Sequence, residues 1–399
     1  MENKLRNFLI AILILTALTR FIRLDYPNAF VFDEVYHGFT SKEYLKTNRE
    51  AWNPFASPPK GVAYEWTHPP LAKEIMTASM FLTQSTDNWA FRLPGAILGV
   101  ISVLFIYLIG GQLLNKPVGL IAAFIFSLEG LNFVQSRTGM NDIYFITFML
   151  ASLLFFLKHR FLLSAIFLGL SFSSKWAAAY ILLFFILFII KKREFKIIPL
   201  FLIVPIIYLL TYIPYFLLGY NADQFIELQR QMWYYHTHLK ATHDYASPWW
   251  SWPLNLYPVW YFVEYFEGKI ANIFAAGNPI VFWLGIAGMG LTIKDYLKTR
   301  SEKLLVIILG YLIFWLPWAL SPRIMFLYHY SPSVPFLTLS LGYQLNKLYQ
   351  SGQKTLVIAL LTLMFLGFVL IFPFLTGIPL PKDFVQYFFY TNLTRNPFT

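Results

Sequence analysis

The chain has 399 residues, of which 57% are hydrophobic and only 13% charged, and its net charge is +11. Soluble domains carry about 25% charged residues, and here long apolar runs recur from end to end. We therefore expect an all-α polytopic membrane protein, since the strands of a β-barrel would be short and alternating. The absence of cysteine excludes disulfides and thiolate nucleophiles. The basic residues lie in short segments between apolar runs, a pattern that argues against nucleic-acid binding.

The apolar runs predict about 11 transmembrane helices in one membrane-embedded domain covering residues 1–399. The first run is expected to stay as a span, because no cleavage site for a signal peptide follows it. The expected spans are 7–24, 92–112, 117–131, 140–157, 161–174, 175–190, 197–218, 279–296, 303–320, 323–345 and 355–376.

The charges predict the orientation of these spans. With the N-terminus in the cytoplasm, the inner segments hold 15 basic and four acidic residues, whereas 13 of the 20 acidic residues fall in the outer segments 25–91 and 219–278. This is the bias that positive-inside topology requires. We expect a plasma-membrane protein whose C-terminus and active site face outward.

The two long outer segments are expected to lie at the membrane surface. In segment 25–91, Pro69 and Pro70 suit a helix start, and residues 71–83 have apolar positions at helical spacing. That stretch is too short to span comfortably and predicts an interfacial helix. Segment 219–278 is rich in aromatic residues, including Trp249, which favour the headgroup level.

Asp33 and Glu34 directly follow the first span, within the aromatic stretch FVFDEVYH. Acids beside an apolar surface are costly unless paired or hydrated, so a functional role is one interpretation of this pair. The alternative is a solvated loop start, or an N-cap for a helix through 34–46.

His68 and Lys73 bracket the rigid Pro-Pro turn of the same segment. A functional pair and a helix start with a surface histidine are both compatible with this spacing. Arg20 and Arg23 end the first span, where snorkelling explains them as well as function does.

Ionisable residues recur at the outer ends of other spans. Arg92, Arg137, Lys175 and Arg323 map to one membrane face, and cations that converge there suit a lipid phosphate. Glu129 and Asp142 add polarity to this face, and His329 lies about two turns beyond Arg323. Charged residues at membrane depth are functional candidates.

Three histidines in YYHTHLKATHDY (His236, His238 and His243) are candidates for a divalent metal site. Substrate contacts by loop residues are the favoured alternative, and no metal or other cofactor is expected to be required. Asn392-Leu393-Thr394 matches an N-glycosylation acceptor, a pattern that also arises by chance.

The chain resembles the protein O-mannosyltransferases, and more closely their bacterial and archaeal members. The resemblance runs nearly end to end. It rests on VFDEVYHG (31–38), THPPLAKE (67–74), FRLPGAILG (91–99), LEGLNFVQSRTGMNDIYF (128–145), SSKWAAAY (173–180), HDYASPWWSWPL (243–254) and PRIMFLYHYSPSVPF (322–336). Eukaryotic members carry a β-trefoil (MIR) domain in the second long outer loop, and the loop of about 60 residues here has no room for it.

The resemblance implies an eleven-span fold of the C type among glycosyltransferases, with interfacial helices in the first outer loop. It also implies transfer of mannose from polyprenyl-phosphate-mannose to Ser or Thr hydroxyls of secreted or membrane proteins. Asp33 would be the catalytic base, Glu34 a site-structuring acid, and Arg20 and Arg92 residues needed for activity. From position, we expect donor contacts at Arg92, Arg137, Lys175, Arg323, His68 and Asp142, and acceptor or supporting contacts at Arg20, His243, Trp249 and His329.

The chemistry needs no metal, because the lipid phosphate is already a good leaving group that cations can stabilise. A carboxylate can accept the proton of the attacking hydroxyl, and in-line attack inverts the anomeric centre. One alternative is transfer of the sugar to a glycolipid or cell-surface polysaccharide. Another is a transporter without chemistry, which would need a polar path through the middle of the spans.

Overall fold

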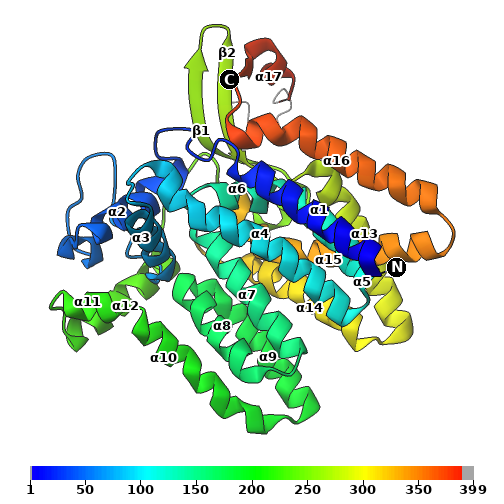
Figure 1. Cartoon of the computed structure of the whole chain (residues 1–399). Coiled ribbons are helices and arrows are strands. Elements are labelled where there is room, and N and C mark those ends of the chain that lie inside the picture. Colours follow the sequence, from blue (N-terminus) through cyan, green and yellow to red (C-terminus); the bar gives the residue numbers. More distant parts are fainter. Residues whose placement is uncertain (1, 389–399) are drawn as a thin grey trace. The chain divides into compact units, whose positions relative to one another are not determined.

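A computed structural model describes residues 2–388, and the Asn392–Thr394 sequon lies outside them. The described chain is mainly helical, as expected (Figure 1). It divides into two compact units, which are described separately below. Unit 1 comprises residues 1–20, 103–134 and 242–399, and unit 2 comprises residues 21–102 and 135–241.

Within residues 2–388, four helical segments are long and apolar enough to cross a membrane. They are α4 (Asn88–Leu113), α13 (Pro279–Thr299), Glu302–Leu320, which joins α14 (Glu302–Trp315) to the short helix η6 (Leu316–Leu320), and α16 (Lys354–Thr376). The pair α5 (Lys116–Ser127) and α6 (Gly130–Arg137), bent by 64°, makes a fifth candidate. The chain is therefore a multi-pass membrane protein, and eleven spans remain a prediction.

Unit 1 is built around α15 (Val334–Gln350), which packs against α5, α13 and α14. Side chains cap the starts of two of these helices. Asn115 accepts a hydrogen bond from the Val118 amide (2.9 Å), and Asn278 accepts one from Ile280 (3.1 Å). Such N-caps satisfy donors that have no partner inside the helix.

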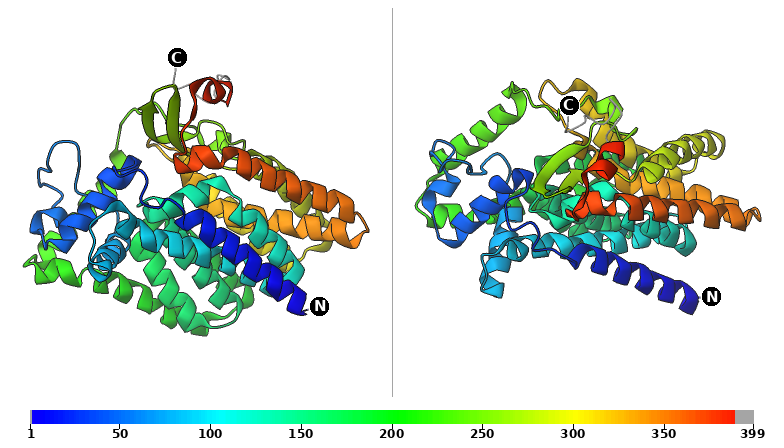
Figure 2. Two further views of the ribbon diagram at one scale, coloured as in Figure 1. Left: turned by 45° about the horizontal axis from the view of Figure 1, so that its top comes forward. Right: turned by 90° about the horizontal axis from the view of Figure 1, so that it is seen from above.

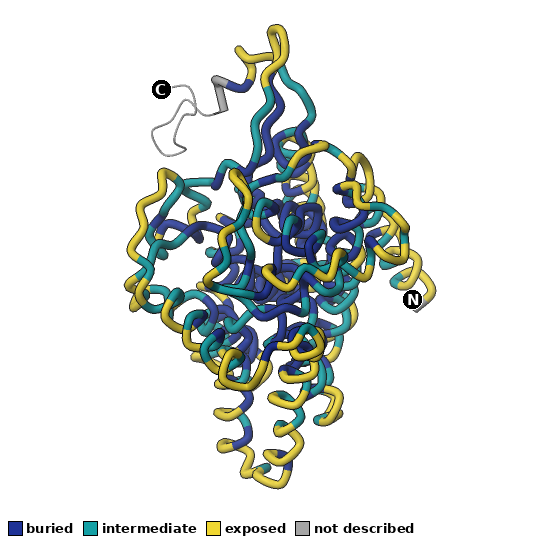
Figure 3. The backbone as a smooth tube through the Cα atoms, turned by 90° about the vertical axis from the view of Figure 1, so that its left-hand side faces the viewer, coloured by how far each residue is buried: buried dark blue, intermediate teal, exposed yellow. Residues whose placement is uncertain are grey.

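A hairpin of β1 (Val259–Phe266) and β2 (Lys269–Ala275) also belongs to unit 1, and Figure 2 shows it beside α17 (Lys382–Phe388) in both views. The strands are antiparallel, and a bulge between Trp260 and Phe262 shifts their register. β2 also pairs with β3 (Leu380–Pro381) and packs against α16. The hairpin tip is exposed, whereas β2 is buried beyond Lys269 (Figure 3).

Unit 2 contains α7 (Asn141–Leu157), α8 (Phe161–Ser174), α9 (Ala179–Lys192) and α10 (Ile203–Leu210), with α7 and α10 both packed on α8. The first outer segment folds here as a 3₁₀ turn, η1 (Phe32–Val35), followed by α2 (His37–Leu45) and α3 (Leu71–Thr83). The bounds of α3 confirm the helix predicted for 71–83. Its buried residues Ala72, Met76 and Met80 pack with Phe91 and Ile143.

Three expectations are corrected. Asp33 lies inside η1 and is not the N-cap of a helix over 34–46, because a 3₁₀ turn precedes α2. The helix expected from Arg323 begins only at Val334, after the 3₁₀ segment η7 (Leu327–Ser333), since Pro332 cannot donate within a helix. Segment 219–278 is also more regular than an aromatic loop, because it contains α12 (Ala222–His238) and the hairpin.

Candidate active site

Glu34 is a buried carboxylate whose oxygens are all engaged. Arg92, near the start of α4, donates Nε to Oε1 (2.8 Å) and Nη2 to Oε2 (2.7 Å). The backbone N–H groups of Val31 and Gly139 donate to the same carboxylate at 2.9 and 2.8 Å. The exposed fractions of the Arg92 and Glu34 side chains are 1% and 0%. Charged, two-pronged pairing of this kind gives fixed geometry.

Arg92 also organises the loop before η1. Its Nη1 donates to the carbonyls of Leu24 (3.2 Å) and Pro27 (3.0 Å), and its Nη2 donates to Ala29 (3.0 Å). All three guanidinium nitrogens therefore have protein partners. Glu34 and Arg92 together join the loop, η1, α4 and the turn before α7.

The neighbouring carboxylate, Asp33, lacks the hydrogen bonds that Glu34 has. It is partly buried, and it makes no side-chain hydrogen bond or ion pair with any residue in the 2–388 range. Burial raises the pKa of Asp33 to about 6, while the nearby charges of His37 and Lys175 lower it and those of Asp142 and Glu65 raise it. The carboxylate of Asp33 therefore has a raised pKa and an open face, meaning that its oxygens are available to a substrate.

Lys175 and Asp142 form an ion pair near Asp33. Lys175 is the C-cap of α8, and its Nζ lies 2.8 and 3.0 Å from the two carboxylate oxygens of Asp142, in the first turn of α7. The side chains are 13% and 4% exposed. Because both groups influence the pKa of Asp33, the pair belongs to the same site.

Two buried amide side chains flank the turn between α6 and α7: Gln135 lies near the end of α6, and Asn141 is the first residue of α7. Both polar atoms of Gln135 and of Asn141 have no hydrogen-bond partner within residues 2–388. Their exposed fractions are 0% and 1%. An unpartnered buried amide costs roughly 1–3 kcal/mol, so this arrangement favours a polar ligand that supplies the missing partners.

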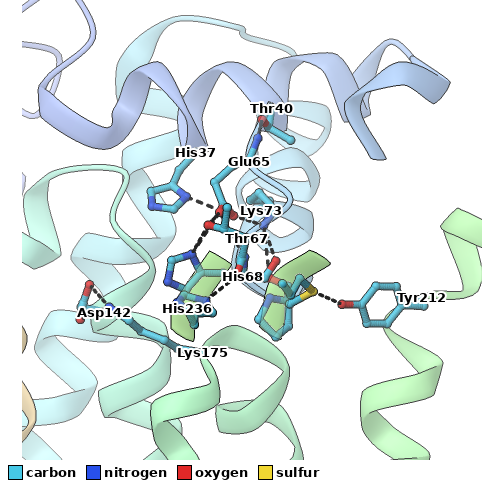
Figure 4. Close-up of polar contacts among 12 residues, drawn as sticks. His37, Thr40, Glu65, Thr67, His68, Lys73, Asp142, Lys175, Tyr212 and His236 are labelled. Atoms are coloured by element: carbon cyan, nitrogen blue, oxygen red, sulfur yellow. Dashed lines mark hydrogen bonds and ion pairs between the residues drawn. The ribbon is translucent and has the colours of Figure 1, made fainter. Parts of the chain in front are cut away.

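The Pro-Pro turn brings a second network to the site. His68 and Lys73 both bind Glu65, a buried residue of the loop before α3, as Figure 4 shows. His236 of α12 donates Nε2 to the carbonyl of Thr67 (2.7 Å). The positive charge of Lys73 and the interactions with His37 and His68 hold the pKa of Glu65 well below its usual range, against the effect of burial.

The remaining predicted residues divide between the two units. In unit 2, Arg137 donates Nη2 to the carbonyl of Ile22 (2.7 Å), beside Arg92's loop. In unit 1, buried Arg20 lies over the Phe133 ring (5.3 Å) and interacts with Glu129.

The other unit 1 residues lie among aromatic rings. His329 is 4.3 Å from the Trp318 ring centroid, Trp249 is 5.4 Å from Trp315, and His243 is 5.3 Å from Phe326. Arg323 lies in the irregular stretch before η7. The structure thus brings Asp33, Glu34, His68, Arg92, Arg137, Asp142 and Lys175 into unit 2, and Arg20, His243, Trp249, Arg323 and His329 into unit 1.

Sequence reasoning did not single out Glu65, Gln135 or Asn141. Glu65 stands three residues before His68 in a loop with no periodicity, so only folding reveals that it binds His68 and Lys73. Across residues 2–388, no group of three His, Asp or Glu side chains is arranged to hold a metal ion.

Comparisons with known proteins agree with this architecture. The profile described as dolichyl-phosphate-mannose-protein mannosyltransferase matches residues 10–239. The profile for the C-terminal four-transmembrane region of protein O-mannosyltransferase matches residues 221–391. The polyprenol-phosphate-mannose–protein mannosyltransferase of Mycobacterium tuberculosis is 24% identical over 96% of this chain and 90% of its own length. The enzyme of that name from Mycolicibacterium smegmatis is 23% identical over 92% and 89%.

Solved structures show the same fold. The Saccharomyces cerevisiae Pmt1–Pmt2 complex bound to the sugar donor superposes with a TM-score of 0.83, covering 99% of this chain and 93% of the yeast chain at 16% identity. ArnT from Cupriavidus metallidurans bound to undecaprenyl phosphate gives 0.61, covering 86% and 60% at 13% identity. The fold is therefore that of the C-type glycosyltransferases.

Proposed function

The chain belongs to the dolichyl-phosphate-mannose-protein mannosyltransferase family, and on this premise we propose that it mannosylates secreted or membrane proteins. The donor is a polyprenyl-phosphate-mannose, and the acceptors are Ser or Thr hydroxyls at the outer membrane face. The names of the relatives from mycobacteria give polyprenol-phosphate-mannose as the donor and protein as the acceptor.

The observation that carries the catalytic proposal is the contrast between two adjacent carboxylates. Glu34 is saturated by Arg92 and by two backbone N–H groups, whereas Asp33 has an open face. A base must have a free oxygen within reach of the hydroxyl proton. Asp33 therefore acts as the base, and Glu34 holds η1 in place.

In the reaction, the acceptor oxygen forms a bond to the anomeric carbon as the bond from that carbon to the phosphate oxygen breaks. The hydroxyl proton passes to Asp33, and the bonding electrons leave with the lipid phosphate. Lys175 stabilises the charge on this leaving group. Attack from the face opposite the phosphate inverts the anomeric centre.

The donor contacts are proposed from the position and chemistry of the groups in this region. Arg92 is a positioning residue in this proposal, because Glu34 and the loop carbonyls use all of its nitrogens. Lys175 is the phosphate ligand, and the buried amides of Gln135 and Asn141 contact the sugar hydroxyls. Arg137 and Arg323 remain candidates for the phosphate, and the reaction requires no metal.

The eleven-span arrangement, with the N-terminus in the cytoplasm and the site outside, is part of this proposal. Its support is the excess of basic residues in the segments expected inside. α3 then lies at the outer interface.

The test is transfer from purified polyprenyl-phosphate-mannose to a Ser/Thr peptide by the full-length protein in lipid nanodiscs. Asp33→Asn should abolish transfer while leaving expression and donor binding largely intact. Near-normal turnover of that variant would exclude Asp33 as the base. Transfer to a lipid acceptor but not to the peptide would exclude the protein acceptor.

A further inference from the structure

Glu65 lies at the centre of a set of donors near Asp33. Its Oε1 accepts hydrogen bonds from the Thr67 hydroxyl, from the backbone N–H of His68 (3.1 Å) and from His68 Nδ1 (3.0 Å). Its Oε2 accepts from Lys73 Nζ and lies 3.7 Å from His37 Nδ1. Since the pKa of Glu65 is held well below its usual range, the carboxylate is ionised and can only accept.

This arrangement determines which nitrogen of His68 carries the proton. Nδ1 faces a carboxylate oxygen, so Nδ1 must be the donor. Burial, as the largest cause, holds the pKa of His68 well below its usual range, so the ring is neutral at pH 7. A neutral ring protonated at Nδ1 has a lone pair at Nε2.

Nothing within residues 2–388 hydrogen-bonds to His68 Nε2, and 19% of the side chain is exposed. The ring is oriented by two edge-to-face neighbours, His236 at 5.1 Å and His37 at 6.0 Å. Figure 4 shows the rings of His68 and His236 between Glu65 and Lys175. Nε2 is thus an oriented acceptor with unused capacity.

The His68 ring belongs to the neighbourhood of Asp33. Glu65 influences the pKa of both residues, and so does the charge of Lys175. A lone pair repels phosphate oxygens and attracts a hydroxyl hydrogen. The chemistry of Nε2 therefore suits a hydroxyl and not the lipid phosphate.

We propose that His68 Nε2 accepts a hydrogen bond from a substrate hydroxyl, and that Glu65 is the positioning residue that maintains this tautomer. The inference rests on the proposed mannosyl transfer, which offers two sources of hydroxyl: the donor sugar and the acceptor Ser or Thr. Lys73 compensates the charge of Glu65, so that the buried carboxylate stays ionised.

The tautomer can be tested without any activity measurement. Nitrogen-15 NMR of histidine-labelled full-length protein, with His68→Gln to identify the His68 signals, should show a protonated Nδ1 and an unprotonated Nε2 at pH 7. Signals from a doubly protonated ring, or from a ring protonated at Nε2, would overturn the inference. If the wild-type protein transferred no mannose, the proposed function would fail while this measurement still decided the tautomer.

Kinetics of transfer test the hydroxyl contact. His68→Ala should lower kcat/KM about tenfold, the effect of one hydrogen bond, and His68→Gln should recover most of it because its amide oxygen can also accept. A rise in KM for the lipid donor identifies the sugar as the source, and a rise in KM for the peptide identifies the acceptor. Equal losses in both variants, or no loss in His68→Ala, would refute the contact. His159→Ala, at an exposed histidine in segment 158–160, is the matched control.

The role of Glu65 is tested with a double variant that keeps the buried charges balanced. Glu65→Gln alone leaves Lys73 without its counter-charge, whereas Glu65→Gln with Lys73→Met removes both charges. The double variant should unfold near the wild-type temperature and yet show a mixture of His68 tautomers and reduced kcat/KM. A double variant with the wild-type tautomer and wild-type kinetics would show that Glu65 does not position His68.

Discussion

Arg92 donates two hydrogen bonds, of 2.8 and 2.7 Å, to the carboxylate of Glu34, and both side chains are almost completely buried. Glu34 is adjacent in sequence to Asp33, which keeps an open face. The pairing of Arg92 with Glu34 explains how the two neighbouring acids can have different roles. Glu34 holds the 3₁₀ turn η1 against α4, and η1 in turn leaves Asp33 accessible.

Breaking this pair should destabilise the protein strongly. Arg92→Met or Glu34→Gln alone leaves an uncompensated buried group, which costs about 3–5 kcal/mol. The double variant should lose less than the sum of the single losses, as seen by thermal unfolding in detergent. Strict additivity would show that the two groups do not interact.

The pH dependence of mannosyl transfer should follow the titration of the Asp33 carboxyl group. The base form is the carboxylate, which is populated above the pKa of about 6. kcat/KM should therefore fall about tenfold per unit as the pH drops below 6. The donor is a phosphodiester and does not titrate in this range. An acid limb near pH 4, the ordinary value for an aspartate, would contradict the shifted pKa.

Asp33→Asn should also leave the protein at least as stable at neutral pH. A carboxyl pKa raised on folding means that the folded state binds more protons, so the ionised group opposes folding as the pH rises from about 4 to 6. Removing the charge should gain on the order of 1 kcal/mol at pH 7, after allowance for solvent screening. A lower unfolding temperature would assign Asp33 a structural role.

Replacing Lys175 should raise the KM for the lipid donor and leave the KM for the peptide acceptor unchanged. Lys175→Met combined with Asp142→Asn removes a buried pair without leaving a lone charge, and KM for the lipid donor should rise about 10- to 100-fold. The matched control is Lys347→Met with Asp295→Asn, a second Lys–Asp pair, at 2.7 Å. An equal rise in the KM for the lipid donor in both double variants would indicate a general effect on the fold.

Gly139 tests the packing behind the acidic pair. A Cβ atom there would lie 3.0 Å from Phe91 Cε2 and 3.3 Å from Glu34 Cγ. Gly139→Ala should cost about 1–3 kcal/mol and lower transfer, since Glu34 must move. Gly290→Ala, where no neighbour lies within 4 Å, should be tolerated. Comparable behaviour of the two variants would show that the space beside Glu34 is not critical.

Local patterns predicted several elements well. The helical spacing of residues 71–83 matches α3, and the apolar run 355–376 matches α16. α12 was missed, although Asn221 and Gln224 form a capping box that marks its start. The aromatic residues of the hairpin do not alternate clearly with polar ones, so periodicity does not predict its strands, and Gly268, with φ of +65°, marks its turn.

The sequence by itself determined that the protein lies in a membrane, which residue runs form helices, and which family it resembles. These properties depend on hydrophobicity, periodicity and short motifs, all of which are local. Only the tertiary structure decided that Arg92 serves Glu34, that Asp33 stays open, and that Glu65 orients His68. Hydrogen bonds between residues far apart in the sequence, such as that from Gly139 to Glu34 across 105 positions, form only when folding brings the segments together.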